Sequence, residues 1–261
     1  MPRSGPAMTL LRPLHLILAL IIPAISAIAW GSLLKLCGRP PASIAKAMTR
    51  VVGCLGPRLA GLTLHCEHPQ RLNTGPAVFI FNHQSGLDPV IVAALISSSA
   101  RQGGVTGVAK QSLAHNPLLG PLLRLTGSLF VTRGEGWEQQ LLPQATARVA
   151  AGCSIVIAPE GTRSYGKGLR VGSFRLGAFA IARHCQIPIV PIVIHNSGTR
   201  LPPRSAQLRS GPVYVSVLEP YKIDPELDLQ QAATKMEHTY DDCLAQGFGA
   251  DIDLDSQPRP Q

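Results

Sequence analysis

The chain has 261 residues, of which 45% are hydrophobic and 15% charged, and its mean hydropathy is +0.17. This composition excludes a largely disordered chain and suffices for one α/β domain plus an anchor or a tail. Lys and Arg outnumber Asp and Glu by 24 to 15, a balance that suits an anionic lipid or a phosphorylated substrate. Only 5% of residues are aromatic, without basic–aromatic interleaving, so we expect no nucleic-acid partner.

The six cysteines form no Cys-x-x-Cys pair, which favours reduced thiols in a domain that faces the cytosol. The run His65-Cys66-Glu67-His68 has side chains of the metal-ligand type. No second cluster completes a site, however, and alternation along an edge strand explains the run equally well. We therefore predict no metal site.

The N-terminal region contains an uncharged stretch of 21 residues, from Leu14 to Leu34. As a helix it would be about 31 Å long, close to the roughly 30 Å hydrocarbon core of a bilayer. Basic residues are more numerous after it than before it, which predicts an inner-membrane protein whose downstream part faces the cytoplasm. A cleaved signal peptide ending near Ala27-Ile28-Ala29 and an interfacial hairpin kinked at Pro23 are the alternatives.

A second, amphipathic helix is predicted from Ala42 to Leu55. Its apolar residues fall on one face, while Lys46 and Arg50 stand four apart on another. Gly56-Pro57 is expected to end this helix. Residues 1–62 are therefore predicted to form a membrane anchor and an amphipathic helix.

From residue 63 onward, short apolar strands alternate with helices. The predicted strands are Thr63–Glu67, Ala77–Phe81, Val105–Ala109, Leu129–Thr132, Ile155–Ala158, Ile189–Ile194 and Val213–Val217. The predicted helices are Pro89–Ser98, Pro117–Leu125, Trp137–Ala151, Arg175–His184 and one within Pro225–Gln246. This alternation predicts an α/β fold with a mostly parallel sheet covered by helices on both faces. We place a catalytic domain at 63–225 and a C-terminal helix with a flexible tail at 226–261.

The most informative segment runs from Asn82 to Pro89 and follows an apolar strand. His83 is thus expected at the carboxyl end of a strand, where open α/β sheets place their sites. Pro89 favours the first helical position, which makes Asp88 the predicted N-cap. The four intervening residues include Gly86 and allow the carboxylate to reach the imidazole, as in a general base oriented by an acid. A loop histidine and a simple cap are the alternatives.

A second strand ends in Glu160-Gly161-Thr162-Arg163, where a hydroxyl, a guanidinium and backbone donors favour phosphate binding. Gly161 to Lys167 also spells all but the last residue of a nucleotide-binding loop. Gly168 stands where that motif needs Ser or Thr, so we expect no nucleotide. Lys110 and Arg133 each follow a strand and are either further phosphate ligands or solvated surface charges.

The segment Ile187 to Val193 is an apolar strand with two prolines, either a core strand or the wall of an acyl pocket. In this order, the four features resemble the glycerolipid acyltransferase family over roughly residues 65–220. The resemblance implies His83 as base and Asp88 as its partner. It implies binding of the glycerophosphate group by Lys110, Arg133, Glu160, Gly161, Thr162 and Arg163. Two departures concern the acceptor: Ala158 replaces an aromatic residue, and Thr132 replaces an aspartate.

The resemblance implies transfer of a fatty acyl group from acyl-CoA or acyl carrier protein to the free hydroxyl of lysophosphatidate. It implies no cofactor, and the partners are the donor, a membrane lipid acceptor and the bilayer. The alternatives are transfer to another lyso-lipid such as lyso-ornithine lipid, a thioester hydrolase with the same dyad, and a non-catalytic lipid-binding scaffold. No Gly-x-Ser-x-Gly elbow is present, which leaves Ser85 as the only tempting nucleophile.

Overall fold

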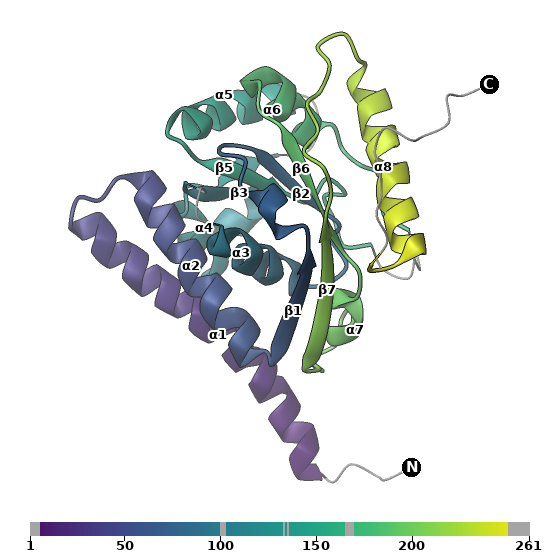
Figure 1. Ribbon diagram of the computed structural model, residues 1–261. Helices are drawn as coiled ribbons and strands as arrows, with labels where there is room; N and C mark the ends of the chain where they lie inside the picture. The colour runs from purple at the N-terminus through teal and green to yellow at the C-terminus, as the bar shows by residue number, and fades with distance from the viewer. Residues whose placement is uncertain (1–5, 100–102, 133, 135, 165–169, 250–261) are drawn as a thin grey trace.

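The structure is a computed structural model that describes residues 6–99, 103–132, 134, 136–164 and 170–249, with side chains described from residue 15. It is built around one seven-stranded sheet in the order β1-β7-β6-β2-β5-β3-β4. Helices α1 to α4 cover one face, and α5, α6 and α8 cover the other (Figure 1). The α/β fold with a mostly parallel sheet and a helical N-terminal segment is therefore confirmed.

The elements follow the predicted order closely. The strands are β1 Leu62–Glu67, β2 Val78–Phe81, β3 Val105–Lys110, β4 Leu129–Val131, β5 Ser154–Ile157, β6 Ile189–Ile194 and β7 Gly211–Val217. The helices are α1 Pro6–Leu36, α2 Pro41–Leu59, α3 Asp88–Ser98, α4 Leu119–Leu125, α5 Trp137–Ala150, α6 Gly177–Cys185, α7 Ser197–Arg200 and α8 Leu229–Gln246. The 3₁₀ turns η1 and η2 span Pro69–Leu72 and Gln111–His115.

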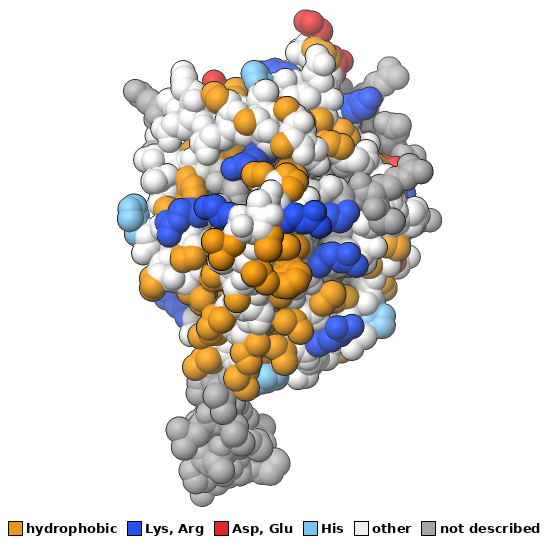
Figure 2. Space-filling view, turned by 90° about the vertical axis from the view of Figure 1, so that its left-hand side faces the viewer, with side chains coloured by type: hydrophobic (Ala, Val, Ile, Leu, Met, Phe, Trp, Pro, Cys, Tyr) orange, Lys and Arg blue, Asp and Glu red, His pale blue; other side chains and the backbone are white. Residues whose placement is uncertain are grey.

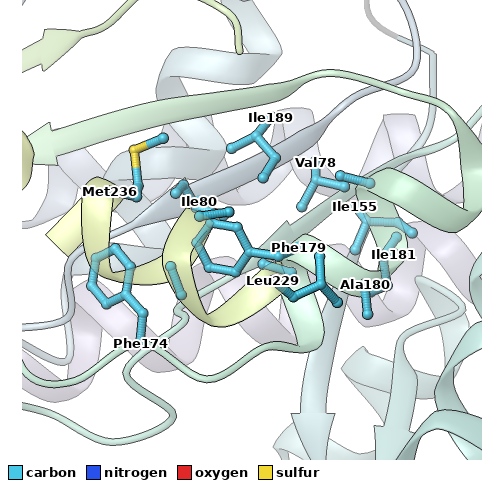
Figure 3. Close-up of a cluster of buried hydrophobic side chains, with 14 of the residues drawn as sticks. Val78, Ile80, Ile155, Phe174, Phe179, Ala180, Ile181, Ile189, Leu229 and Met236 are labelled. Atoms are coloured by element: carbon cyan, nitrogen blue, oxygen red, sulfur yellow. The ribbon is translucent and has the colours of Figure 1, made fainter. Parts of the chain in front are cut away.

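Strands β6, β2, β5, β3 and β4 run parallel, so their carboxyl ends share one edge of the sheet. Strand β7 runs antiparallel to β6, and β1 runs parallel to β7. Every residue of β2 and β6 is buried, as expected for strands covered on both faces. Val78 and Ile80 face the core beneath α6 and α8 (Figure 3), whereas Phe79 and Phe81 face the core on the α3 side.

A tyrosine from α8 bridges the two central strands β2 and β6 beside Pro191. Ile80 lies opposite Pro191, whose carbonyl faces away from β2 and accepts from the Leu218 N–H at 2.9 Å. The Tyr240 hydroxyl donates to the Ile80 carbonyl at 2.9 Å and accepts from the Ile192 N–H at 3.1 Å. Tyr240 is completely buried. Helix α8 is thus bonded to the two central strands, one of which leads directly to His83.

The expected end of the second helix at Gly56-Pro57 is wrong, because α2 continues to Leu59. The reason lies in its packing against α3. A Cβ on Gly53 would lie 2.7 Å from the Ala93 carbonyl oxygen, and one on Gly56 would lie 2.3 Å from Val90 Cγ1. These glycines let two helices approach closely and do not terminate α2.

Helix α1 is the one described helix long and apolar enough to cross a membrane, over His15–Leu36. It packs along α2, and its buried side is made of small residues: Ala19, Ala24 and Ala27. Its other side exposes Ile17, Leu18, Ile22, Ile25, Trp30, Leu33 and Leu36. Figure 2 shows hydrophobic side chains gathered on this side of the molecule, with Lys and Arg side chains across and beside them.

We predict that Tyr240→Phe lowers the free energy of unfolding by about 1–3 kcal/mol, because it leaves buried backbone groups of β2 and β6 without a partner. Thermal unfolding of the purified protein in detergent checks this. Tyr221→Phe is the matched control, since no described residue hydrogen-bonds its hydroxyl. Equal melting temperatures for the two variants would contradict the role of Tyr240.

Candidate active site

The predicted site residues gather at the carboxyl edge of the parallel strands. His83 lies two residues beyond β2, and Glu160 lies three residues beyond the neighbouring strand β5. Lys110 ends β3, the next strand along, and its side chain is exposed. Arg133 follows β4 but lies outside the described residues. The topology therefore brings three of the four segments to adjacent positions because parallel strands share one edge.

His83 and Asp88 form a direct pair. The Nδ1 atom of His83 lies 2.8 Å from Oδ2 of Asp88, and the imidazole packs edge-on against Phe81. Asp88 is fully buried, whereas the His83 side chain is 21% exposed. No described residue forms a hydrogen bond with Nε2 of His83. The ring is thus held at one nitrogen and open at the other.

Asp88 also closes the turn that carries His83. Its Oδ2 atom accepts hydrogen bonds from the Gln84 and Ser85 N–H groups, each at 2.7 Å. The prediction that Asp88 is the N-cap is wrong, because Leu87 is the N-cap and Asp88 is the first residue of α3. The carboxylate therefore turns back onto the preceding turn, where three donors compete successfully with the N–H groups of its own helix.

Two polar residues anchor the turn to the rest of the fold, and the motif alone did not reveal this role. The Asn82 amide accepts from the Ile194 N–H at 2.7 Å and donates to the Ile194 carbonyl at 2.9 Å. The Ser85 hydroxyl donates to the Leu201 carbonyl at 3.1 Å and accepts from the Leu87 N–H at 3.2 Å. In the sequence, the position of the polar residue Asn82 directly after an apolar strand is the feature that indicates such a role. Ser85 is structurally engaged, which argues against a nucleophilic role.

The loop after β5 adjoins the dyad. Gly161 has a φ of +65°, a conformation that favours glycine over other residues. Beyond it, Thr162 and Arg163 are exposed, and the Ser164 N–H donates to the His83 carbonyl at 2.8 Å. The loop with this exposed hydroxyl and guanidinium is thus bonded to the main chain of His83, an arrangement that suits an anionic group bound near a base.

Glu160 differs from its neighbours because it is buried. Its Oε1 atom accepts from the His83 N–H and its Oε2 atom from the Gly172 N–H, both at 2.7 Å. Burial raises the pKa of the Glu160 carboxyl, and these two hydrogen bonds oppose that rise because they favour the ionised form. Unlike Thr162 and Arg163, Glu160 faces the protein interior.

A second group of residues of the types found in catalytic triads lies on the face of the sheet that α8 covers, near the end of that helix. His195 Nε2 lies 2.9 Å from the Ser216 hydroxyl, which donates to Glu67 at 2.8 Å. In a hydrolytic triad the histidine stands between serine and acid, whereas here the serine does. Burial lowers the pKa of His195. Among the described residues, no group of three His, Cys, Asp or Glu side chains is arranged to hold a metal ion.

Comparisons with known proteins agree with this geometry. The family model "Acyltransferase" matches residues 63–195. A 1-acyl-sn-glycerol-3-phosphate acyltransferase of Salmonella typhimurium is 32% identical over 207 residues, which cover 78% of this chain and 80% of that protein. One of Saccharomyces cerevisiae is 32% identical over 164 residues, which cover 62% of this chain but only 52% of that longer protein.

Among solved structures, the 1-acyl-sn-glycerophosphate (LPA) acyltransferase PlsC from Thermotoga maritima has the same fold, with a TM-score of 0.68 at 19% identity. The alignment covers 92% of this chain and 98% of that one. The matched segment of the family model begins at β1 and ends just after β6, so it contains the His83–Asp88 pair and the loop after β5. The chain belongs to the acyltransferase family.

Proposed function

We propose that this enzyme transfers a fatty acyl group from acyl-CoA or acyl carrier protein to the free hydroxyl of lysophosphatidate, which yields phosphatidate. The observation that carries the proposal is the 2.8 Å contact between His83 and Asp88 beside the loop with Thr162 and Arg163. The names of the Salmonella and yeast relatives support the same acceptor.

In the proposed reaction, Nε2 of His83 takes the proton of the acceptor hydroxyl while that oxygen attacks the thioester carbonyl. Such general-base assistance accelerates reactions by about 10²–10⁴-fold. The tetrahedral intermediate then expels the thiolate, which receives the proton back from the imidazolium. Asp88 keeps the second proton on Nδ1 and stabilises the imidazolium, because its carboxylate is itself held by two backbone donors. No covalent acyl-enzyme forms in this scheme.

The acceptor phosphate is proposed to bind through Arg163 and Thr162, with Lys110 and Arg133 as further ligands. Arg163 and Lys110 are exposed at the same sheet edge as His83. A phosphomonoester carries up to two negative charges and several acceptor oxygens, which suits several cations. The cationic head group of a choline or ornithine lipid would be repelled there, at a cost of a few kcal/mol if partly desolvated. This electrostatic preference supports lysophosphatidate over those acceptors.

The N-terminal helices are proposed to hold the enzyme on the cytoplasmic face of the inner membrane. The apolar row of α1 is exposed along its length, and α2 adds Lys46, Arg50 and Arg58 beside it. An apolar face flanked by cations suits a bilayer that contains anionic lipids. The N-terminal end of β1 also lies at the carboxyl edge of β2, so this anchor enters the domain on the side of the site.

We predict that His83→Ala lowers the rate of acyl transfer at least about 100-fold without lowering the melting temperature, because the base is lost from a partly exposed position. The measurement is product formation from acyl-CoA and lysophosphatidate. His184→Ala, an exposed histidine of α6, is the control. Retention of more than about a tenth of wild-type turnover by His83→Ala would sink the assignment, and release of free fatty acid alone by the wild type would indicate a hydrolase.

We predict that Arg163→Ala raises the KM for lysophosphatidate at least about tenfold and leaves the KM for acyl-CoA within about twofold, because one charge-assisted bond to the phosphate is lost. Arg183→Ala at the end of α6 is the matched control. The idea fails if wild-type enzyme prefers a zwitterionic lyso-lipid or if both KM values stay unchanged.

We predict that the double substitution Ile25→Glu and Leu33→Glu shifts the full-length protein from the membrane to the soluble fraction, because both side chains belong to the exposed row of α1. Phe248→Glu, an exposed apolar residue beyond α8, serves as the control. Protease added outside intact cells should leave the catalytic domain uncut. Unchanged membrane association of the double variant, or cleavage from outside, would contradict the anchor or its orientation.

A further inference from the structure

The carboxylate of Glu160 is fully engaged inside the protein. The residue is 4% exposed, and each of its oxygens accepts a 2.7 Å hydrogen bond from a backbone N–H group. A phosphate group at the neighbouring loop would carry the same sign of charge and would be repelled by this carboxylate. Direct binding of the acceptor is therefore a poor explanation for Glu160.

The backbone of His83 is held on both sides by the segment that begins at Glu160. The His83 N–H donates to Oε1 of Glu160, and the His83 carbonyl accepts from the Ser164 N–H at 2.8 Å. Asp88 orients the imidazole ring but does not by itself place the main chain of His83 relative to the neighbouring strand. The loop after β5 provides that constraint across the two carboxyl ends.

Gly172 gives an independent indication that the position of Glu160 matters. A Cβ at residue 172 would lie 2.8 Å from Oε2 of Glu160 and 2.9 Å from the Ser164 hydroxyl. Any side chain there would displace the carboxylate that the Gly172 N–H binds. The absence of a side chain at residue 172 therefore provides the space that the Glu160 carboxylate occupies.

We infer that Glu160 is a positioning residue that acts through the main chain of His83, and that it couples the phosphate-binding loop to the base. The inference rests on the proposed role of His83 as general base. Thr162 and Arg163 lie two and three residues after Glu160. An acceptor phosphate bound by them therefore takes a defined position relative to the carboxylate that fixes His83. Loss of this relative position misplaces the base with respect to the acceptor hydroxyl but removes no phosphate ligand.

The first test is Glu160→Gln in the purified full-length enzyme. The amide oxygen of glutamine can still accept one of the two hydrogen bonds. Its NH₂ group faces the other backbone N–H, and because both are donors that bond is lost. We expect kcat to fall about 100-fold, the scale of a misplacement of about 1 Å. KM for the acceptor and for acyl-CoA should stay within about threefold. Glu226→Gln, an exposed glutamate before α8, is the matched control for the change in charge.

A second variant and a second measurement test the inference in ways that do not depend on the folding or the activity of Glu160→Gln alone. Gly172→Ala should reproduce the selective loss of kcat, since it displaces the same carboxylate. Amide hydrogen exchange within residues 82–85 should accelerate about tenfold in Glu160→Gln, because the His83 N–H loses a charged acceptor. This exchange measurement needs no substrate, and melting temperatures identify any variant that is unfolded.

A raised acceptor KM at unchanged kcat would overturn the inference and assign Glu160 to substrate binding. Wild-type kcat in a folded Gly172→Ala protein, or unchanged exchange at residues 82–85, would also overturn it. If the wild type acylates a different lyso-lipid, the proposed acceptor is wrong, and the kcat and KM values are measured with that lipid. If it acylates none, the proposed function fails, whereas unchanged exchange contradicts the positioning role alone.

Discussion

The carboxylate of Asp88 organises the site because a single oxygen, Oδ2, accepts three hydrogen bonds. One comes from the imidazole of His83, and two come from the N–H groups of Gln84 and Ser85. A fully buried carboxylate is costly to leave unpaired, so the turn must wrap around it. The same interaction shapes the turn, starts α3 at Asp88 and selects the tautomer of the base. The shape of this turn and the proposed chemistry of His83 therefore both depend on Oδ2 of Asp88.

The turn is also held from outside by three neighbouring segments. Asn82 bonds to the end of β6, Ser85 bonds to the chain after α7, and the His83 main chain bonds to the loop after β5. Each bond replaces a water contact with a buried or partly buried contact to a rigid element, which reduces the freedom of a short irregular segment. The imidazole is thus exposed on one side only, toward the place where the acceptor and donor are proposed to meet.

The two central strands show how a residue far along the chain completes the hydrogen bonding at the centre of the sheet. Tyr240 lies on α8, far along the chain from both strands, and its hydroxyl donates to the Ile80 carbonyl of β2 and accepts from the Ile192 N–H of β6. Tyr240 belongs to the buried cluster formed by α6, α8 and the central strands, other members of which are drawn in Figure 3. The chain beyond residue 225 therefore supports the strand that leads to His83, although the division into segments at 225 and 226 stays a prediction.

Much of this protein follows from local pattern. The apolar runs and their turn residues predicted the order of strands and helices, because buried strands and helices have different periods and breakers. The spacing from His83 to Asp88 predicted their contact, since four residues with a glycine suffice for a tight turn. The long uncharged stretch before Leu36 predicted an apolar helix. These features depend on residues close to one another in the chain.

Other features were decided only by contacts between distant segments. Gly56-Pro57 indicated a helix end, yet Gly56, like Gly53, serves the close approach of α3 to α2. Asp88 matched an N-cap, yet the preceding turn provides better donors for its carboxylate. Glu160 stood in a phosphate-binding motif, yet it turns inward to the N–H groups of His83 and Gly172. Residue types and spacing determined which groups are present. Packing determined which atoms each group faces, because most buried polar atoms take their hydrogen-bond partners from segments distant in the chain.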